Sequence, residues 1–96
     1  MSMKEAYEKK MQAKLDEWDA EIDKLKAKAN SAEADLQLKY EKQIKELKAM
    51  QETAYKKLEE LKKANEDAWE DLKAGIENTW DTIDTSVKSA FSRFFK

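Results

Sequence analysis

The apolar side chains of this chain recur every three or four residues from Tyr7 to Phe94, and Asn65 is the one strongly polar member of the series. The 24 steps of the series span 87 residues, so the mean spacing is about 3.6 residues. That spacing is the period of an α-helix, whereas side chains on one face of a β-strand recur every second residue. Because the intervening side chains are almost all polar, the pattern predicts long helices with one apolar face and one solvated face.

The composition favours the same fold class. Charged residues make up 42% of the 96 residues, and the chain contains one glycine, one valine and no proline. The near absence of glycine and proline removes the usual turn signals, and the clusters of β-branched residues that favour strands are lacking. We therefore expect a single all-α domain built from long amphipathic helices.

Two short segments are candidate turns. Near residue 30, either Asn30 or Ser31 is positioned to cap a following helix, and Glu33 would complete a capping box with Asn30. Near residue 65, Asn65 is a second candidate N-cap, followed by acids that suit a first helical turn. The pattern predicts a coiled-coil hairpin or a three-helix bundle; since neither break holds a glycine, a near-continuous helix paired with a second chain is the alternative. The predicted helices cover about residues 4–29, 31–64 and 66–94.

The residue pattern also divides the chain into two regions. Residues 1–65 form a charged coiled-coil shaft, in which five acid–base pairs four residues apart support the helix on its solvated face. Residues 66–96 are predicted to form an amphipathic helix with an 11-residue apolar repeat, a period that packs with little or right-handed supercoil. The solvated face of this second region carries serines and threonines.

The apolar residues of the shaft are predicted to form a seam for another helix, in the same chain or in a second copy, because one helix cannot bury them alone. Asn65 and Gln51 are placed to set the register of that seam, as single buried polar groups do in helical zippers. The predicted seam residues are Leu15, Trp18, Ile22, Leu25, Leu36, Ile44, Leu47, Leu58 and Leu61.

The apolar face of residues 66–96 has two interpretations. It either packs as a third helix on the first two or docks against a membrane or a larger protein. Bulky apolar residues opposite a Ser/Thr face are typical of helices that lie on a membrane surface, although the seven acids between residues 66 and 84 disfavour anionic lipid. The candidate docking residues are Trp69, Leu72, Ile76, Trp80, Ile83, Val87, Phe91, Phe94 and Phe95, with Lys88 and Arg93 as basic neighbours.

Three stretches, "LDEWDAEIDKLKAKA", "KYEKQIKELKAMQE" and "DAWEDLKAGIENTWD", are followed by an end of the type "VKSAFSRF". In these stretches the chain resembles small bacterial coiled-coil-domain proteins of uncharacterised function. That resemblance implies helices and self-association, with no assigned activity. The 11-residue repeat of residues 68–96 also resembles the amphipathic repeats of lipid-droplet coat proteins, apolipoproteins and synucleins, which implies contact with lipid.

Several kinds of chemistry are disfavoured. The chain has no histidine and no cysteine, so Ser–His and Cys–His nucleophiles cannot form and the usual zinc ligands are missing. Lysines alternate with acids before residue 64 and the net charge is -2, so there is no unpaired basic face for nucleic acid. Acids in "NEDAWED" suit a first helical turn better than a metal site. We expect no enzyme activity, cofactor, metal or small-molecule substrate.

The sequence therefore predicts a non-enzymatic helical scaffold or adaptor. It would associate through the coiled-coil seam, with itself or with a larger protein, and dock by its aromatic C-terminal helix. The alternative is an amphitropic membrane-surface protein that binds lipid through residues 66–96. No apolar stretch approaches the roughly 20 residues that span a bilayer, and the first ten residues have no apolar run typical of a signal peptide. We expect a cytoplasmic protein, with peripheral membrane contact under the alternative.

Overall fold

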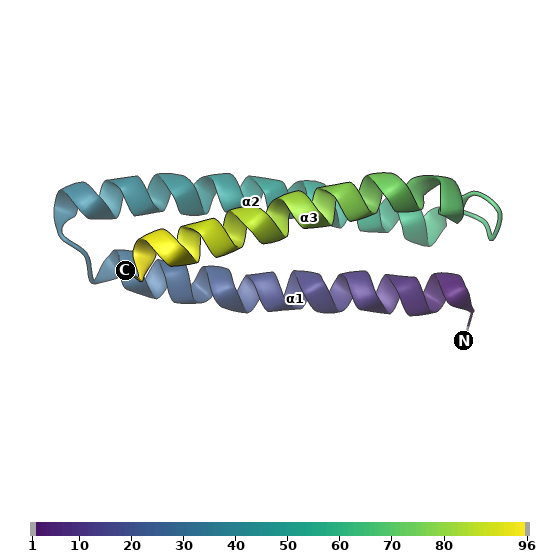
Figure 1. The fold of residues 1–96 in the computed structure, drawn as a ribbon, viewed down its shortest axis with the longest axis horizontal. Coiled ribbons are helices and arrows are strands. Elements are labelled where there is room, and N and C mark those ends of the chain that lie inside the picture. Colours follow the sequence, from purple (N-terminus) through teal and green to yellow (C-terminus); the bar gives the residue numbers. More distant parts are fainter. Residues whose placement is uncertain (1, 96) are drawn as a thin grey trace.

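The computed structural model describes residues 2–95 and contains three α-helices (Figure 1). The helices are α1 (Met3–Asn30), α2 (Ala34–Lys63) and α3 (Trp69–Phe94). Helix α2 runs antiparallel to the other two, so the C-terminal end of α3 lies at the same end of the bundle as the α1–α2 turn (Figure 1). The molecule is a rod of 51 × 19 × 18 Å. The prediction of an all-α fold is confirmed, and residues 2–95 include no strand.

The first turn lies at residues 31–33, close to the predicted place, but its hydrogen bonds differ from the prediction. The hydroxyl of Ser31 donates to the carbonyl of Lys28 over 2.9 Å, so Ser31 closes α1 instead of capping α2. Glu33 is the residue before α2, and its side chain makes no capping bond. The predicted capping box of Asn30 and Glu33 is wrong, because Asn30 still belongs to the last turn of α1.

The second turn is held by Asn65. Its side-chain oxygen accepts hydrogen bonds from the backbone N–H groups of Asp67 (3.1 Å) and Ala68 (2.8 Å). This capping role was predicted, but residues 66–68 form a turn and α3 begins only at Trp69. Asn65 is exposed, so its predicted role as a buried register residue is wrong.

One continuous core runs along the axis of the rod, and all three helices contribute to it. Burial of each large apolar side chain stabilises the fold by about 1.5–3 kcal/mol relative to leaving it in water. Chain segments from both predicted regions share this core. The buried apolar residues are Tyr7, Met11, Leu15, Trp18, Ile22, Leu25 and Ala29 from α1, Ile44, Leu47, Ala54, Leu58 and Leu61 from α2, and Trp69, Ile76, Trp80, Ile83, Val87, Ala90 and Phe94 from α3.

The interface between α1 and α2 contains a polar cluster near the middle of the rod. The side-chain amide of Gln51, which is 6% exposed, donates to one carboxylate oxygen of Asp19. The hydroxyl of Tyr55 donates to the other oxygen over 3.2 Å. Because a buried amide loses stabilisation without a partner, this pairing favours one axial register of α2 against α1.

Candidate functional site

The predicted docking face of α3 lies largely inside the bundle. Six of its nine apolar residues are buried against α1 and α2, and Leu72 and Phe91 are half-buried. Phe95 is 49% exposed, and Lys88 and Arg93 are also exposed. The apolar face of α3 therefore contacts protein within the same chain, as expected if α3 packs as a third helix on the first two. The six buried residues are Trp69, Ile76, Trp80, Ile83, Val87 and Phe94.

Aromatic pairs join α3 to α1 along the rod. The rings of Trp18 and Trp80 have centroids 5.9 Å apart and are tilted by 48°. Trp80 also donates its indole N–H to the backbone carbonyl of Met11 over 3.2 Å. Tilted aromatic pairs add about 0.5–1.5 kcal/mol beyond burial of their area. The large aromatics of α3 are thus fixed in place by both packing and a hydrogen bond.

A similar arrangement is found near the N-terminus of α1. Tyr7 and Trp69 have ring centroids 5.7 Å apart, and the Tyr7 hydroxyl donates to the carbonyl of Lys73 over 3.5 Å. Burial is the main cause that raises the pKa of Tyr7 to about 12, and the nearby carboxylate of Glu77 raises it further. The Tyr7 hydroxyl therefore stays neutral at physiological pH and acts as a structural hydrogen-bond donor.

Asp84 is the most connected carboxylate between α1 and α3. Its oxygens accept the indole N–H of Trp18 at 3.3 Å and lie 2.9 Å from the ammonium of Lys88 and 3.4 Å from that of Lys14. The hydrogen bond with Lys88 is the largest cause that lowers the pKa of Asp84, with further lowering from Trp18 and Lys14. Asp84 is ionised at neutral pH and ties α3 to α1, which is a structural role.

The predicted seam residues also lie in the core, with one exception. Eight of the nine are buried, whereas Leu36 is 42% exposed. Tyr40, one turn further along α2, stacks on Phe94 at a centroid distance of 3.8 Å. Because α3 ends beside Tyr40, the first turn of α2 extends beyond α3 and Leu36 has no side chain of α3 opposite it. The prediction that Leu36 lies in the seam is wrong.

Among residues 2–95, no group of three or more histidine, cysteine or acidic side chains could hold a metal ion, and "NEDAWED" is included in that range. No helix of the described chain is long and apolar enough to cross a membrane. Interaction surfaces are therefore the features that remain to be assigned a function.

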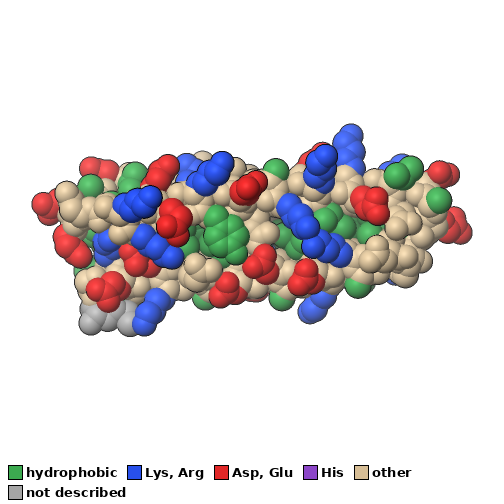
Figure 2. Space-filling model, turned by 180° about the vertical axis from the view of Figure 1, so that it is seen from behind, with side chains coloured by type: hydrophobic (Ala, Val, Ile, Leu, Met, Phe, Trp, Pro, Cys, Tyr) green, Lys and Arg blue, Asp and Glu red, His purple; other side chains and the backbone are tan. Residues whose placement is uncertain are grey.

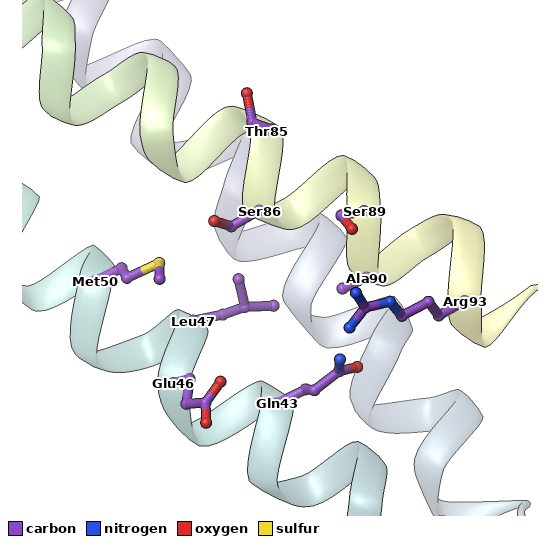
Figure 3. Close-up of a pocket in the computed structure, with 9 residues that line it drawn as sticks. All are labelled: Gln43, Glu46, Leu47, Met50, Thr85, Ser86, Ser89, Ala90 and Arg93. Carbon is purple, nitrogen blue, oxygen red and sulfur yellow. The ribbon is translucent and has the colours of Figure 1, made fainter.

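A half-open groove of about 270 Å³ separates the C-terminal half of α3 from α2 (Figure 3). Leu47 points into the groove from α2, and Arg93 extends across its far end towards Gln43 (Figure 3). Between residues 2 and 95, no hydrogen bond or ion pair joins α2 to α3; all polar links of α3 to another helix go to α1. The lining residues of the groove are Gln43, Glu46, Leu47, Met50, Thr85, Ser86, Ser89, Ala90 and Arg93.

The chain matches no family model, and comparison with curated proteins and with solved structures found no significant similarity. The features of the bundle itself therefore carry the functional argument.

Exposed apolar side chains concentrate at one end of the rod. We define the tip as residues 24–45 and 85–95, which surround the α1–α2 turn and the C-terminal end of α3 (Figure 1). Three of the five exposed large apolar side chains among residues 2–95 belong to it. They are Leu36 (42% exposed), Leu38 (67%) and Phe95 (49%), whereas Met3 and Tyr55 lie elsewhere.

The sequence pattern predicted Phe95 as a docking residue but did not single out Leu38, the most exposed large apolar side chain of the tip. Leu38 falls between two positions of the apolar series, Leu36 and Tyr40, so the helical period places it on the solvated face. A large apolar residue at a solvated position was the available signal. The tip also unites residues that are about 60 positions apart in the chain, which no local pattern reveals.

Proposed function

We propose that the protein is a non-enzymatic helical adaptor of the cytoplasm that docks through the tip of its bundle. The observation that carries this proposal is the location of the exposed residues. Leu36 is the one exposed member of the predicted seam, Phe95 is the one exposed apolar member of the predicted docking face, and both belong to the tip. Exposed apolar side chains that gather in one place are typical of interaction sites.

The closed core supports a docking role for the tip and a purely structural role for the rest of the rod. The apolar face of each helix is covered by the other two helices of the same chain. The rod can therefore act as a rigid spacer of 51 Å that presents the tip at one end. Self-association and binding to a larger protein both remain open to it through the exposed surface.

Site-specific photo-cross-linking in cells that make the native protein tests the docking function. A photo-reactive amino acid replaces Leu38 or Phe95 at the tip, and Tyr55, which is 38% exposed outside the tip, serves as the matched control. We expect a defined adduct, to protein or to lipid, from the two tip positions and none from position 55. Equal adducts from all three positions, or none from the tip, would contradict the docking function.

The alternative function is amphitropic lipid binding through residues 66–96. It is favoured by the α2–α3 interface, which has no hydrogen bond or ion pair within residues 2–95. Separation of α3 from α2 would break only apolar contacts, and the part of the apolar face that packs on α2 could then bury itself in lipid. Entry of Trp69 and Trp80 into lipid also requires α3 to leave α1, to which both are bound. Vesicles with brominated acyl chains test this alternative, because they quench Trp69 and Trp80 if α3 enters the bilayer and leave both unquenched if the bundle stays closed.

A further inference from the structure

The fold separates charge along the rod. The tip holds eight basic and three acidic side chains, a formal charge of +5. The rest of the described chain, residues 2–23 and 46–84, holds ten basic and eighteen acidic side chains, a formal charge of -8. The chain as a whole has a net charge of only -2, and the fold places two basic segments, residues 24–45 with a formal charge of +3 and residues 85–95 with +2, at the same end of the rod. The basic residues of the tip are Lys24, Lys26, Lys28, Lys39, Lys42, Lys45, Lys88 and Arg93.

Basic and apolar side chains are mixed at the tip. The ammonium of Lys28 lies 5.7 Å from the centre of the Phe95 ring, which joins the C-terminal end of the chain to the last turn of α1. Figure 2 shows the bundle from behind with the tip on the right; apolar and acidic side chains stand at the extremity, and basic side chains are set back from it. This surface combines exposed hydrophobic groups with a net positive charge, and two of its lysines, Lys26 and Lys88, pair with Asp23 and Asp84 just outside the tip.

We propose that the tip docks the intact bundle onto an anionic membrane surface. The proposal rests on the docking function above and names the partner of that same site. Lysine and arginine side chains near an anionic lipid surface are attracted by its negative potential, and the exposed side chains of Leu38 and Phe95 can insert between headgroups. This mode of membrane binding differs from lipid binding through residues 66–96, because the bundle stays closed and its tryptophans stay buried.

Two observations favour lipid over other partners. Leu38 and Phe95 are exposed on two different helices near one end of a narrow rod, and a fluid bilayer accepts such separate side chains without a shape-matched pocket. A second copy of the chain could offer its acidic part, but among residues 2–95 only Met3 and Tyr55 are large, apolar and exposed outside the tip. The acidic part thus matches the charge of the tip and offers little to its apolar side chains.

The three acids of the tip would be repelled by anionic lipid, so neutralising them tests the inference. Glu33 and Asp35 lie at the start of α2, where the helix dipole stabilises negative charge. Their position therefore has a structural reason. Glu41, the third acid, is also exposed. If anionic lipid is the partner, neutralising Glu33 and Asp35 must strengthen binding, whereas removing nearby lysines must weaken it.

The test is co-sedimentation of the full chain with phosphatidylcholine vesicles, with and without about one third phosphatidylglycerol, together with tryptophan emission. We expect binding only to the anionic vesicles, weaker at high salt because exposed charges are screened. The emission of Trp18, Trp69 and Trp80 should not change on binding, since these side chains remain in the core.

Paired variants assign the binding to the tip. Lys39→Gln with Lys42→Gln should weaken binding at least tenfold, since each lysine near anionic lipid contributes roughly a fivefold effect. Lys9→Gln with Lys56→Gln removes the same charge from exposed positions outside the tip and should change binding less than threefold. Leu38→Ser with Phe95→Ser should also weaken binding, and Glu33→Gln with Asp35→Asn should strengthen it. Circular dichroism checks that each variant stays helical.

Three outcomes would overturn the membrane inference, and they differ in whether the docking function of the tip survives. If the wild-type chain binds no vesicles while tip positions still cross-link to a protein in cells, the partner is a protein and the docking function survives. If neither binding nor tip adducts are found, both proposals fail. If vesicles bind with a large change in tryptophan emission and equal affinity for both lysine variants, α3 opens onto lipid and the tip is not the docking site.

Discussion

Helix α3 is held differently by its two neighbours. Towards α1 it makes three hydrogen bonds, an ion pair and two aromatic contacts, and towards α2 it makes apolar contacts that include the stack of Tyr40 on Phe94. Hydrogen bonds and aromatic pairs fix distance and orientation, whereas apolar burial depends mainly on area. The α1–α3 interface therefore fixes the orientation of α3 by directional contacts, whereas the α2–α3 interface holds it by apolar burial. Half-open grooves of similar volume, about 260 Å³ and 270 Å³, border the two interfaces.

The largest expected effect is that of Trp80→Glu on the α1–α3 interface. The change removes a side chain that is 4% exposed, its hydrogen bond to Met11 and its contact with Trp18, and it places a carboxylate in the core. Loss of a buried tryptophan alone costs about 3–5 kcal/mol, so Tm should fall by roughly 20 °C or more. Thermal unfolding followed by circular dichroism, without lipid, measures this fall in Tm.

Phe95→Glu is the control for this substitution. The same new charge is placed on α3's exposed C-cap residue, where it removes an exposed cation–π contact with Lys28, so the free energy of unfolding should change by only about 1 kcal/mol or less. An unchanged melting curve for Trp80→Glu would show that Trp80 is not packed in the bundle in solution.

Asp84→Ala should cost about 2 kcal/mol, because Trp18 and Lys14 of α1 both lose their partner. The pKa of Asp84 is lowered in the folded state, so its contribution is present above the ordinary aspartate pKa of about 4 and is lost as pH falls through the lower folded value. Urea unfolding between pH 7 and pH 2 should show a shallower acid loss in the variant. Asp81→Ala changes an exposed position on the same helix that makes no side-chain hydrogen bond or ion pair within residues 2–95, and it should retain the wild-type pH dependence.

Gly75→Ala tests the opposite side of α3. Gly75 is in the middle of α3 beside Lys57 and Glu60 of α2, and a methyl group added there would meet no atom within 4 Å. Alanine favours a helix over glycine by about 0.5–1 kcal/mol, so the variant should be more stable by that amount. A loss of stability in urea unfolding would mean that α2 lies closer to α3 than the structure places it.

Ser86→Ala should have the smallest effect. Ser86 lines the α2–α3 groove, and its hydroxyl donates to the carbonyl of Thr82 within α3 (2.9 Å). Since no bond to α2 is lost and alanine is the better helix former, stability should be unchanged or higher by up to about 0.5 kcal/mol. A loss above 1 kcal/mol in the same assay would reveal a polar link between the two helices.

Helices and core were largely predictable from the sequence, because the apolar series of period 3.6 continues through every element. The hydrogen bonds of the turns were less predictable. The Ser31 hydroxyl can cap the following helix or bond back to the preceding one, and in the structure it bonds back to Lys28 of α1. The exposure of Leu36 depends on where α3 ends relative to α2, which is a tertiary property. Local sequence contains no information of that kind.

The candidate site was harder to predict than the fold. The apolar face of α3 satisfies the requirements of a bundle and of a membrane surface equally well, so the pattern alone could not choose between them. Leu38 is a large apolar residue on the otherwise polar, solvated face of its helix, and it does not belong to the apolar series. Residues 24–45 carry a formal charge of +3 and residues 85–95 one of +2, and the antiparallel packing of α2 brings the two segments to one end (Figure 1).

The most direct test of the central claim, that the aromatic face of α3 is buried within its own chain, is a nuclear Overhauser measurement between the indoles of Trp18 and Trp80. The sample is the full chain, without lipid, as a mixture of isotope-labelled and unlabelled molecules. The structure predicts a strong cross-peak within single molecules, because the ring centroids are 5.9 Å apart. A cross-peak found only between labelled and unlabelled molecules, or no cross-peak at all, would contradict the bundle and favour an extended helix paired with a second chain.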